Sequence, residues 1–209
     1  IHDRAPGAAD AGAAQREPGA GVIGDVFRGE RLRLAALSAA DIPVLARWWQ
    51  DGAFLRLFDA DPAHPLSAQQ MAEKVEAWRK EPGTFMFAAR PLDGDELIAF
   101  VELDGILWSQ RMGWISIAIG DPARRGQGYG AEALRLLLRY AFDELNLYRV
   151  QLTVFSYNPG AIRLYEKLGF VREGVFREAV HRDGARHDMI LYGLLRREWE
   201  ATRGDRPSP

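Results

Sequence analysis

The chain has no cysteine among its 209 residues. This absence excludes disulfide bonds, thiolate ligands for metal ions and a covalent acyl-cysteine intermediate. It also fits a reducing compartment, so we expect a cytoplasmic protein.

Long apolar runs and an excess of positive charge are also missing. No run reaches the roughly 18 apolar residues of a membrane span, and no signal peptide is recognisable. Lys and Arg number 27 against 29 Asp and Glu, a net charge of −2. Because nucleic-acid-binding domains usually carry a basic excess, we expect neither nucleic acid nor a membrane as the main partner.

The length and the hydrophobic fraction of 47% predict a single globular domain. Residues 1–28 are rich in Ala, Gly and Pro and show no apolar period, so we expect a mobile N-terminal tail. The domain is then expected over residues 29–201, with a short C-terminal tail at 202–209.

Hydrophobic periodicity and capping residues predict a mixed sheet with helices on both faces. Ser38 with Asp41, and Ser67 with Gln70, are typical of capping boxes at two helix starts. Three successive runs indicate an antiparallel meander, and β–α–β–α–β–β follows it. Strands are expected near 31–37, 84–90, 96–108, 113–120, 149–155, 171–180 and 187–195, and helices near 38–50, 67–80, 129–145, 158–170 and 196–201.

The segment "ARRGQGYGAEAL" at residues 123–134 places Gly126, Gly128 and Gly130 where a helix begins. Glycine weakens a helix, so a local reason for three of them is needed. A strand, a glycine-rich turn and a helix together present free backbone N–H groups to an anion, and Arg124 and Arg125 add positive charge. A helix that merely starts after a flexible turn is the alternative.

Three phosphate-binding patterns compete for this segment. The Walker pattern fails because Gln127, not Lys followed by Ser or Thr, comes after Gly126. The dinucleotide pattern is met formally by Gly126, Gly128 and Ala131, but the strand at 149–155 lacks the acidic residue that should follow. The third pattern is a coenzyme A pyrophosphate loop.

Two motifs give the chain a family resemblance. Arg125, Gly128 and Gly130 form R-x-x-G-x-G, and "NLYRVQLTVFSYNPGAIRLYEKLGFVREG" follows at the right spacing. Together they resemble the GNAT superfamily of acetyl-CoA-dependent N-acetyltransferases, over residues from about 31 to 200. The chain is most similar to the branch of ribosomal-protein alanine and spermidine acetyltransferases. The resemblance implies an α+β fold with a mostly antiparallel sheet of about seven strands and a splayed parallel pair.

The resemblance also implies a donor site for acetyl-CoA. In the family the pantetheine arm lies between two splayed strands, here "WISIAIG" and "RVQLTVF". Backbone N–H groups near Ala118, Ile119 and Gly120 are implied to bind the arm and polarise the carbonyl. Asn158 is implied to bond the pantetheine amide, although it also suits a helix N-cap. The implied pyrophosphate loop consists of Arg124, Arg125, Gly126, Gln127, Gly128, Tyr129 and Gly130.

Two residues are candidates for proton transfer. Tyr165 occupies the position of the family's general acid, and a phenol is protonated at neutral pH. Glu102 stands in the apolar run "LIAFVEL", where burial would raise its pKa toward that of a useful base; an outward, solvated Glu102 is the alternative. Many relatives have an acidic residue near position 115, whereas this chain has Ile115, which counts against polyamine recognition.

The resemblance implies transfer to a primary amine, either a protein N-terminus or a small molecule, and by analogy a homodimer. No metal is expected, because His181, His187 and Asp188 fit no standard ligand spacing. Two other functions stay open: a catalytically silent acetyl-CoA sensor of the same fold, and a nucleotide-binding domain.

Overall fold

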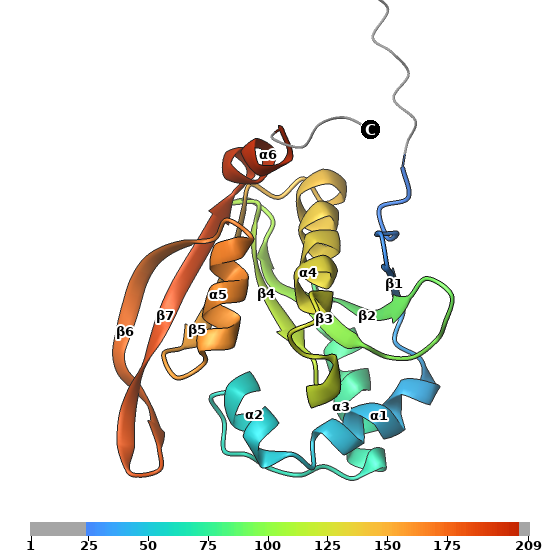
Figure 1. Cartoon of the computed structure of the whole chain (residues 1–209), viewed down its shortest axis with the longest axis vertical. Helices are drawn as coiled ribbons and strands as arrows, with labels where there is room; N and C mark the ends of the chain where they lie inside the picture. The colour runs from blue at the N-terminus through green and yellow to red at the C-terminus, as the bar shows by residue number, and fades with distance from the viewer. Residues whose placement is uncertain (1–23, 205–209) are drawn as a thin grey trace, which may run out of the picture.

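A computed structural model describes residues 24–204 of the chain, without the side chains of the last two. Most of the two expected tails lies outside these residues. Residues 24–28 run beside the first strand, where Arg28 forms a bridge to Arg33. Figure 1 shows the whole arrangement.

The strands form one seven-stranded sheet in the order β1-β2-β3-β4-β5-β7-β6. Every neighbouring pair is antiparallel except β4 and β5, which are parallel. The predicted fold class and the predicted meander are therefore confirmed. The strands are β1 (Leu32–Ala35), β2 (Phe85–Pro91), β3 (Ala99–Leu107), β4 (Met112–Ala118), β5 (Arg149–Phe155), β6 (Val171–Arg182) and β7 (Ala185–Leu195).

The helices begin largely where capping residues predicted. The Ser67 side chain accepts a hydrogen bond from Gln70 N, and the Gln70 side chain accepts one from Ser67 N. At the first helix the Asp41 carboxylate accepts from Ser38 N. The helices are α1 (Ile42–Trp48, after a 3₁₀ turn at Ala39–Asp41), α2 (Gly52–Phe58), α3 (Ala68–Lys80), α4 (Tyr129–Arg139, continued by a π-helical segment at Tyr140–Glu144), α5 (Pro159–Lys167) and α6 (Arg196–Gly204).

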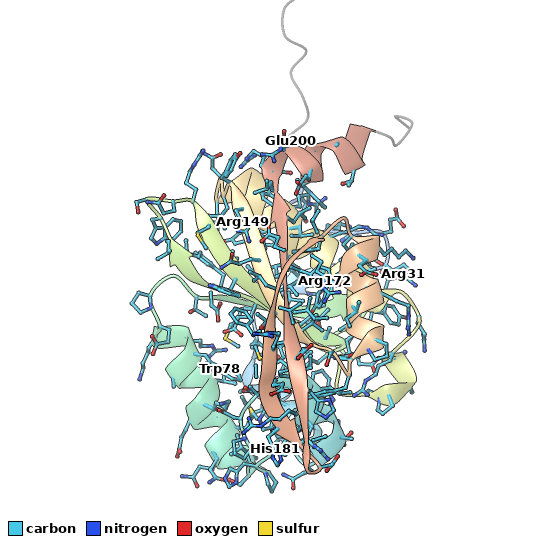
Figure 2. All side chains as sticks on the ribbon, turned by 90° about the vertical axis from the view of Figure 1, so that its left-hand side faces the viewer. Arg31, Trp78, Arg149, Arg172, His181 and Glu200 are labelled. Carbon is cyan, nitrogen blue, oxygen red and sulfur yellow. The ribbon has the colours of Figure 1, made fainter. Side chains whose placement is uncertain are left out.

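Each face of the sheet has its own hydrophobic core, as the alternation of β3 shows. Val101 and Leu103 belong to the core under α4 and α5, whereas Phe100 belongs to the core under α1, α2 and α3. Figure 2 shows Trp78 of α3 and Arg31 on opposite sides of the sheet. The prediction of helices on both faces is confirmed, and the two faces offer separate environments for polar side chains.

The long β6–β7 hairpin extends to the end of the sheet where α2 lies (Figure 1). Near its tip, Arg182 donates hydrogen bonds of 2.8–3.2 Å to the carbonyl groups of Asp59, Ala60 and Asp61. Arg56 of α2 forms an ion pair with Asp183 at 2.6 Å. The last hairpin of the chain therefore holds the segment that follows α2.

The end of β4 is packed directly against α1. A Cβ atom on Gly120 would lie 1.9 Å from the ring of Trp48, so the indole occupies the place of a side chain. Trp48 is only 6% exposed and is enclosed by the second core. Residue 120 must be glycine for α1 to keep this position.

Gly120→Ala should lower the free energy of unfolding by about 1–3 kcal/mol, because the buried indole has to move. Gly174→Ala is the matched control, since a Cβ atom there meets nothing within 4 Å. Chemical denaturation of the three proteins measures the difference. Equal midpoints for Gly120→Ala and the parent would show that α1 is not held by this contact.

Candidate active site

The parallel pairing of β4 with β5 stops part-way along both strands. It runs from Met112–Arg149 to Trp114–Gln151 and does not continue in the described structure. The outer edges stay paired, β4 with β3 as far as Ala118 and β5 with β7 as far as Phe155. The facing edges of residues 115–118 and 152–155 thus lack ladder partners, which leaves backbone groups for an extended ligand.

Different reasons explain the three glycines of the loop between β4 and α4. Gly126 and Gly128 have φ values of +73° and +85°, a region that favours glycine. A Cβ on Gly130 would lie 3.4 Å from the side chains of Ile119 and Leu164, so here glycine permits close packing of the helix.

Within the described residues, the N-terminus of α4 has no side-chain cap. The N-cap side chains of α2, α3 and α5 (Asp51, Ser67 and Asn158) each accept a first-turn N–H, whereas α4 has Gly128 as its N-cap. Its first N–H groups have no intrahelical acceptor, and the helix dipole adds a positive potential. This end of α4 is thus suited to an anion supplied by a ligand.

Both arginines of the loop donate hydrogen bonds to other groups of the protein. Arg124 donates to both carboxylate oxygens of Glu96 at 2.7 Å. Arg125 donates from Nε to the carbonyl of Ile119 at 2.9 Å and from Nη2 to that of Gly120 at 3.0 Å. These contacts fasten the loop to its surroundings, and the role of the two side chains in binding an anion stays a prediction.

Tyr165 lies on α5, on the α4–α5 face of the sheet, and is 7% exposed. Its ring contacts that of Phe170, with the centroids 5.8 Å apart. Burial raises the pKa of the phenol to about 12. At neutral pH the hydroxyl is therefore a proton donor.

Asn158 is the N-cap of α5, one of the two roles that the sequence suggested for it. Its Oδ1 accepts a hydrogen bond from Ala161 N at 3.1 Å. Within residues 24–204 no hydrogen bond is formed by its side-chain amide N–H groups, which can therefore donate to a ligand carbonyl.

Glu102 lies on β3 on the other face of the sheet, alternating with Val101 and Leu103. Ser116 of β4, its cross-strand partner, donates from Oγ to its carboxylate at 3.2 Å. Burial, assisted by the nearby Asp104, raises the pKa of Glu102 to about 7, against the opposing effects of Ser116 and Lys74. The carboxyl can therefore take up and release a proton near neutral pH. A fully solvated Glu102, the alternative, does not describe this side chain.

His187 and Asp188 of the β6–β7 hairpin contact other residues of the protein. The rings of His187 and Tyr157 lie edge to face, with centroids 4.9 Å apart, and the Asp188 carboxylate accepts from Glu178 N. Residues 24–204 contain no group of three or more His, Asp or Glu that could hold a metal ion. No helix within that range is long and apolar enough to cross a membrane.

Four residues around the site were not predicted. Ser116 contacts the Glu102 carboxylate, Trp48 packs on Gly120, and Arg31 and Glu132 form an ion pair beside the glycine loop. Of these four, only Glu132 could have been found from the sequence, because it is an acidic residue beside the apolar face of a predicted helix.

A gap between parallel strands, next to a helix start that suits an anion, agrees with what a family comparison finds. The profile of the acetyltransferase (GNAT) domain matches residues 31–171. The chain belongs to the GNAT family of acetyltransferases. It is 35% identical to an uncharacterized N-acetyltransferase from the SPbeta prophage of Bacillus subtilis (strain 168), over 85% of this chain and 97% of the relative. An uncharacterized N-acetyltransferase of Bacillus licheniformis is 29% identical over 81% of this chain and 96% of its own.

One solved structure of a similar fold contains coenzyme A. The spermidine N-acetyltransferase of Vibrio cholerae, in complex with CoA and spermine, superposes with a TM-score of 0.74 at 25% identity. The match covers 82% of this chain and 99% of the other. Our chain is thus a GNAT N-acetyltransferase that uses acetyl-CoA.

Gly128→Ala should weaken acetyl-CoA binding at least about tenfold, the effect of losing one hydrogen bond to a charged group. The new methyl group would meet Arg31 Nη2 at 3.1 Å and disturb the loop. Gly184→Ala in the β6–β7 turn, with φ +78° and no neighbour, is the control with similar backbone strain. Calorimetric titration measures both; an equal affinity for the two variants would exclude the loop from donor binding.

Proposed function

We propose that this GNAT enzyme transfers the acetyl group of acetyl-CoA directly to a primary amine, within a ternary complex. One observation carries the proposal. The pairing of β4 with β5 ends after Trp114, Tyr165 on the α4–α5 face of the sheet is a phenol with a raised pKa, and Glu102 on the other face, with a pKa of about 7, accepts a hydrogen bond from Ser116 on the unpaired part of β4.

In this proposal the pantetheine arm lies extended in the gap, where backbone groups of Ala118, Ile119 and Gly120 bind it. The diphosphate lies at the loop of residues 124–130 and the N-terminus of α4, where N–H groups and the dipole favour an anion. Asn158 donates from its free amide N–H to the arm. The side-chain contacts of Arg125 and Trp48 fix the end of β4 and so pre-organise these groups.

The proposed chemical step is a direct acyl transfer. The amine nitrogen attacks the thioester carbonyl carbon, a C–N bond forms and the C–S bond breaks. The amine proton goes to the Glu102 carboxylate, and the departing thiolate takes the proton of the Tyr165 hydroxyl. Acid and base lie on opposite faces of the sheet, which matches an amine that enters from one side of the thioester and a thiol that leaves on the other.

The face of the sheet that carries Glu102, where the amine is proposed to bind, favours a cation. Glu102 and Asp104 lie on the same face of β3, and burial raises the pKa of both, so that their charge responds to an approaching ammonium group. Ile115 is buried in the core under α4 and adds no charge to this face. We propose a primary amine as acceptor, a class that includes the spermidine named for the Vibrio cholerae relative and protein N-termini.

A thiol-release assay with acetyl-CoA and a panel of polyamines, amino acids, aminoglycosides and N-terminal peptides tests the function. Amine-dependent release of coenzyme A supports transfer. Tight acetyl-CoA binding without release for any amine would instead favour a sensor of the same fold.

Tyr165→Phe should lower kcat by about 10²–10⁴-fold, because it removes the proton donor and little packing. The acetyl-CoA Kd should change little, since the proton is needed only as the thiolate forms. Steady-state kinetics with one working amine, together with calorimetry, separate the two effects. Turnover close to that of the parent would assign protonation of the thiolate to water.

Glu102→Gln should remove the pH dependence that Glu102 imposes. The parent's kcat/KM is expected to fall as the pH drops through about 7, because protonated Glu102 cannot accept the amine proton. The variant should be slower by about 10²-fold or more and lack this inflection. Glu73→Gln, an exposed carboxylate on α3, should keep the parent profile. An unchanged profile in Glu102→Gln would exclude Glu102 as the base.

A further inference from the structure

Arg31, immediately before β1, brings a positive charge to the glycine loop from a distant part of the chain. Its Nη1 donates to the carbonyl of Gln127 at 3.1 Å, and its Cζ lies 4.8 Å from the ring centroid of Tyr129. Nη2 lies 3.1 Å from the position that a Cβ on Gly128 would take. The guanidinium thus contacts Gln127 and Tyr129 and lies beside Gly128 at the N-terminus of α4.

Glu132 fixes the direction of this side chain. Its carboxylate accepts hydrogen bonds from Arg31 N at 2.6 Å, Leu32 N at 2.9 Å and Arg31 Nε at 3.0 Å. Burial alone would raise the pKa of Glu132, but these hydrogen bonds outweigh burial and lower it. The carboxylate therefore stays ionised, and it engages Nε so that the Nη end of Arg31 points to the loop.

Arg31 brings a free guanidinium N–H donor to the loop. Of the other two arginines, Arg124 donates from Nη2 to Glu96, and Arg125 donates from Nε and Nη2 to two carbonyl groups. The side chain of Arg31 is 50% exposed, and no hydrogen bond of its Nη2 is formed within the described residues. A half-exposed guanidinium with a free N–H donor is well suited to bind phosphate.

The space beside Arg31 is open and electropositive. Arg31 lines a groove of about 550 Å³ that continues along α4 past Arg135 to Lys167. Neither of these two side chains has a carboxylate partner in the part of the chain that is described. Five basic residues line the groove (Arg28, Arg31, Arg135, Arg139 and Lys167) against two acidic ones, Glu30 and Glu132, so a phosphate-bearing ligand meets a net positive charge there.

We propose that Arg31 is a donor-binding residue that contacts the diphosphate of acetyl-CoA, and that Glu132 is its positioning residue. The inference rests on the proposed function and adds to the backbone N–H groups a side chain that the loop motif does not contain. Figure 2 shows Arg31 on the α4–α5 side of the sheet, opposite Trp78 of α3.

The test compares two acetyl donors, acetyl-CoA and S-acetylpantetheine, which has the same thioester and arm but no diphosphate. Arg31→Gln should raise the KM for acetyl-CoA by about 10–100-fold, the effect of lost hydrogen bonds to a charged group, and leave kcat nearly unchanged. Its kcat/KM with S-acetylpantetheine should equal that of the parent. Arg31→Lys should recover part of the affinity, and Glu132→Gln should show a smaller selective loss.

Arg33→Gln is the matched control, because Arg33 is a cation only two residues from Arg31, and it pairs with the exposed Asp95 instead of the loop. It should leave the KM for both donors unchanged. An equal loss for both donors in Arg31→Gln would overturn the proposal and make Arg31 a purely structural residue, and so would an unchanged KM for acetyl-CoA.

Direct binding separates this inference from the proposed function. Calorimetry with CoA and with pantetheine needs no turnover, and Arg31→Gln should weaken only the binding of CoA. If the parent binds CoA without acetylating any amine, the proposed function fails while Arg31 is still tested. If the parent turns over and Arg31→Gln binds CoA like the parent, only the inference about Arg31 fails.

Discussion

The site depends on one constraint, the end of the β4–β5 ladder after Trp114 and Gln151. Each strand keeps its outer neighbour beyond that point, so neither can close the gap without breaking an existing ladder. The end of β4 is also held by Trp48 against Gly120 and by Arg125 on two carbonyl groups. Backbone groups that a sheet would normally pair are therefore kept ready for an extended ligand.

The same physical cause, burial, prepares the two proposed proton-transfer groups for opposite tasks. It raises the pKa of Tyr165 to about 12 and that of Glu102 to about 7. The phenol thereby keeps its proton throughout the neutral range, whereas the carboxyl comes to exchange one there. Because the sheet separates the two side chains, each can have its own apolar surroundings without forming a direct pair with the other.

The sequence predicted the features that depend on local pattern. Alternation indicated the strands, and Ser67 with Gln70 indicated the start of α3. Helix α2 was not predicted, because Phe54, Leu55 and Phe58 follow a glycine in a segment too short to show a helical period. Contacts between distant residues left no local signal: Arg31 reaches Gln127 across 96 positions, and Trp48 lies where Gly120 has no side chain. The loop motif likewise could not show that Glu96 pairs with Arg124.

The contact between Arg182 and the segment after α2 has a consequence for the order in which the chain folds. The carbonyl groups of Asp59, Ala60 and Asp61 receive their donor from a residue 121–123 positions later. During synthesis at the ribosome, these carbonyl groups emerge long before Arg182 does, and until then only water can satisfy them. The segment after α2 is therefore among the last parts of the enzyme to be fixed, and a nascent chain that stops short of the final hairpin has α2 in place without its anchor.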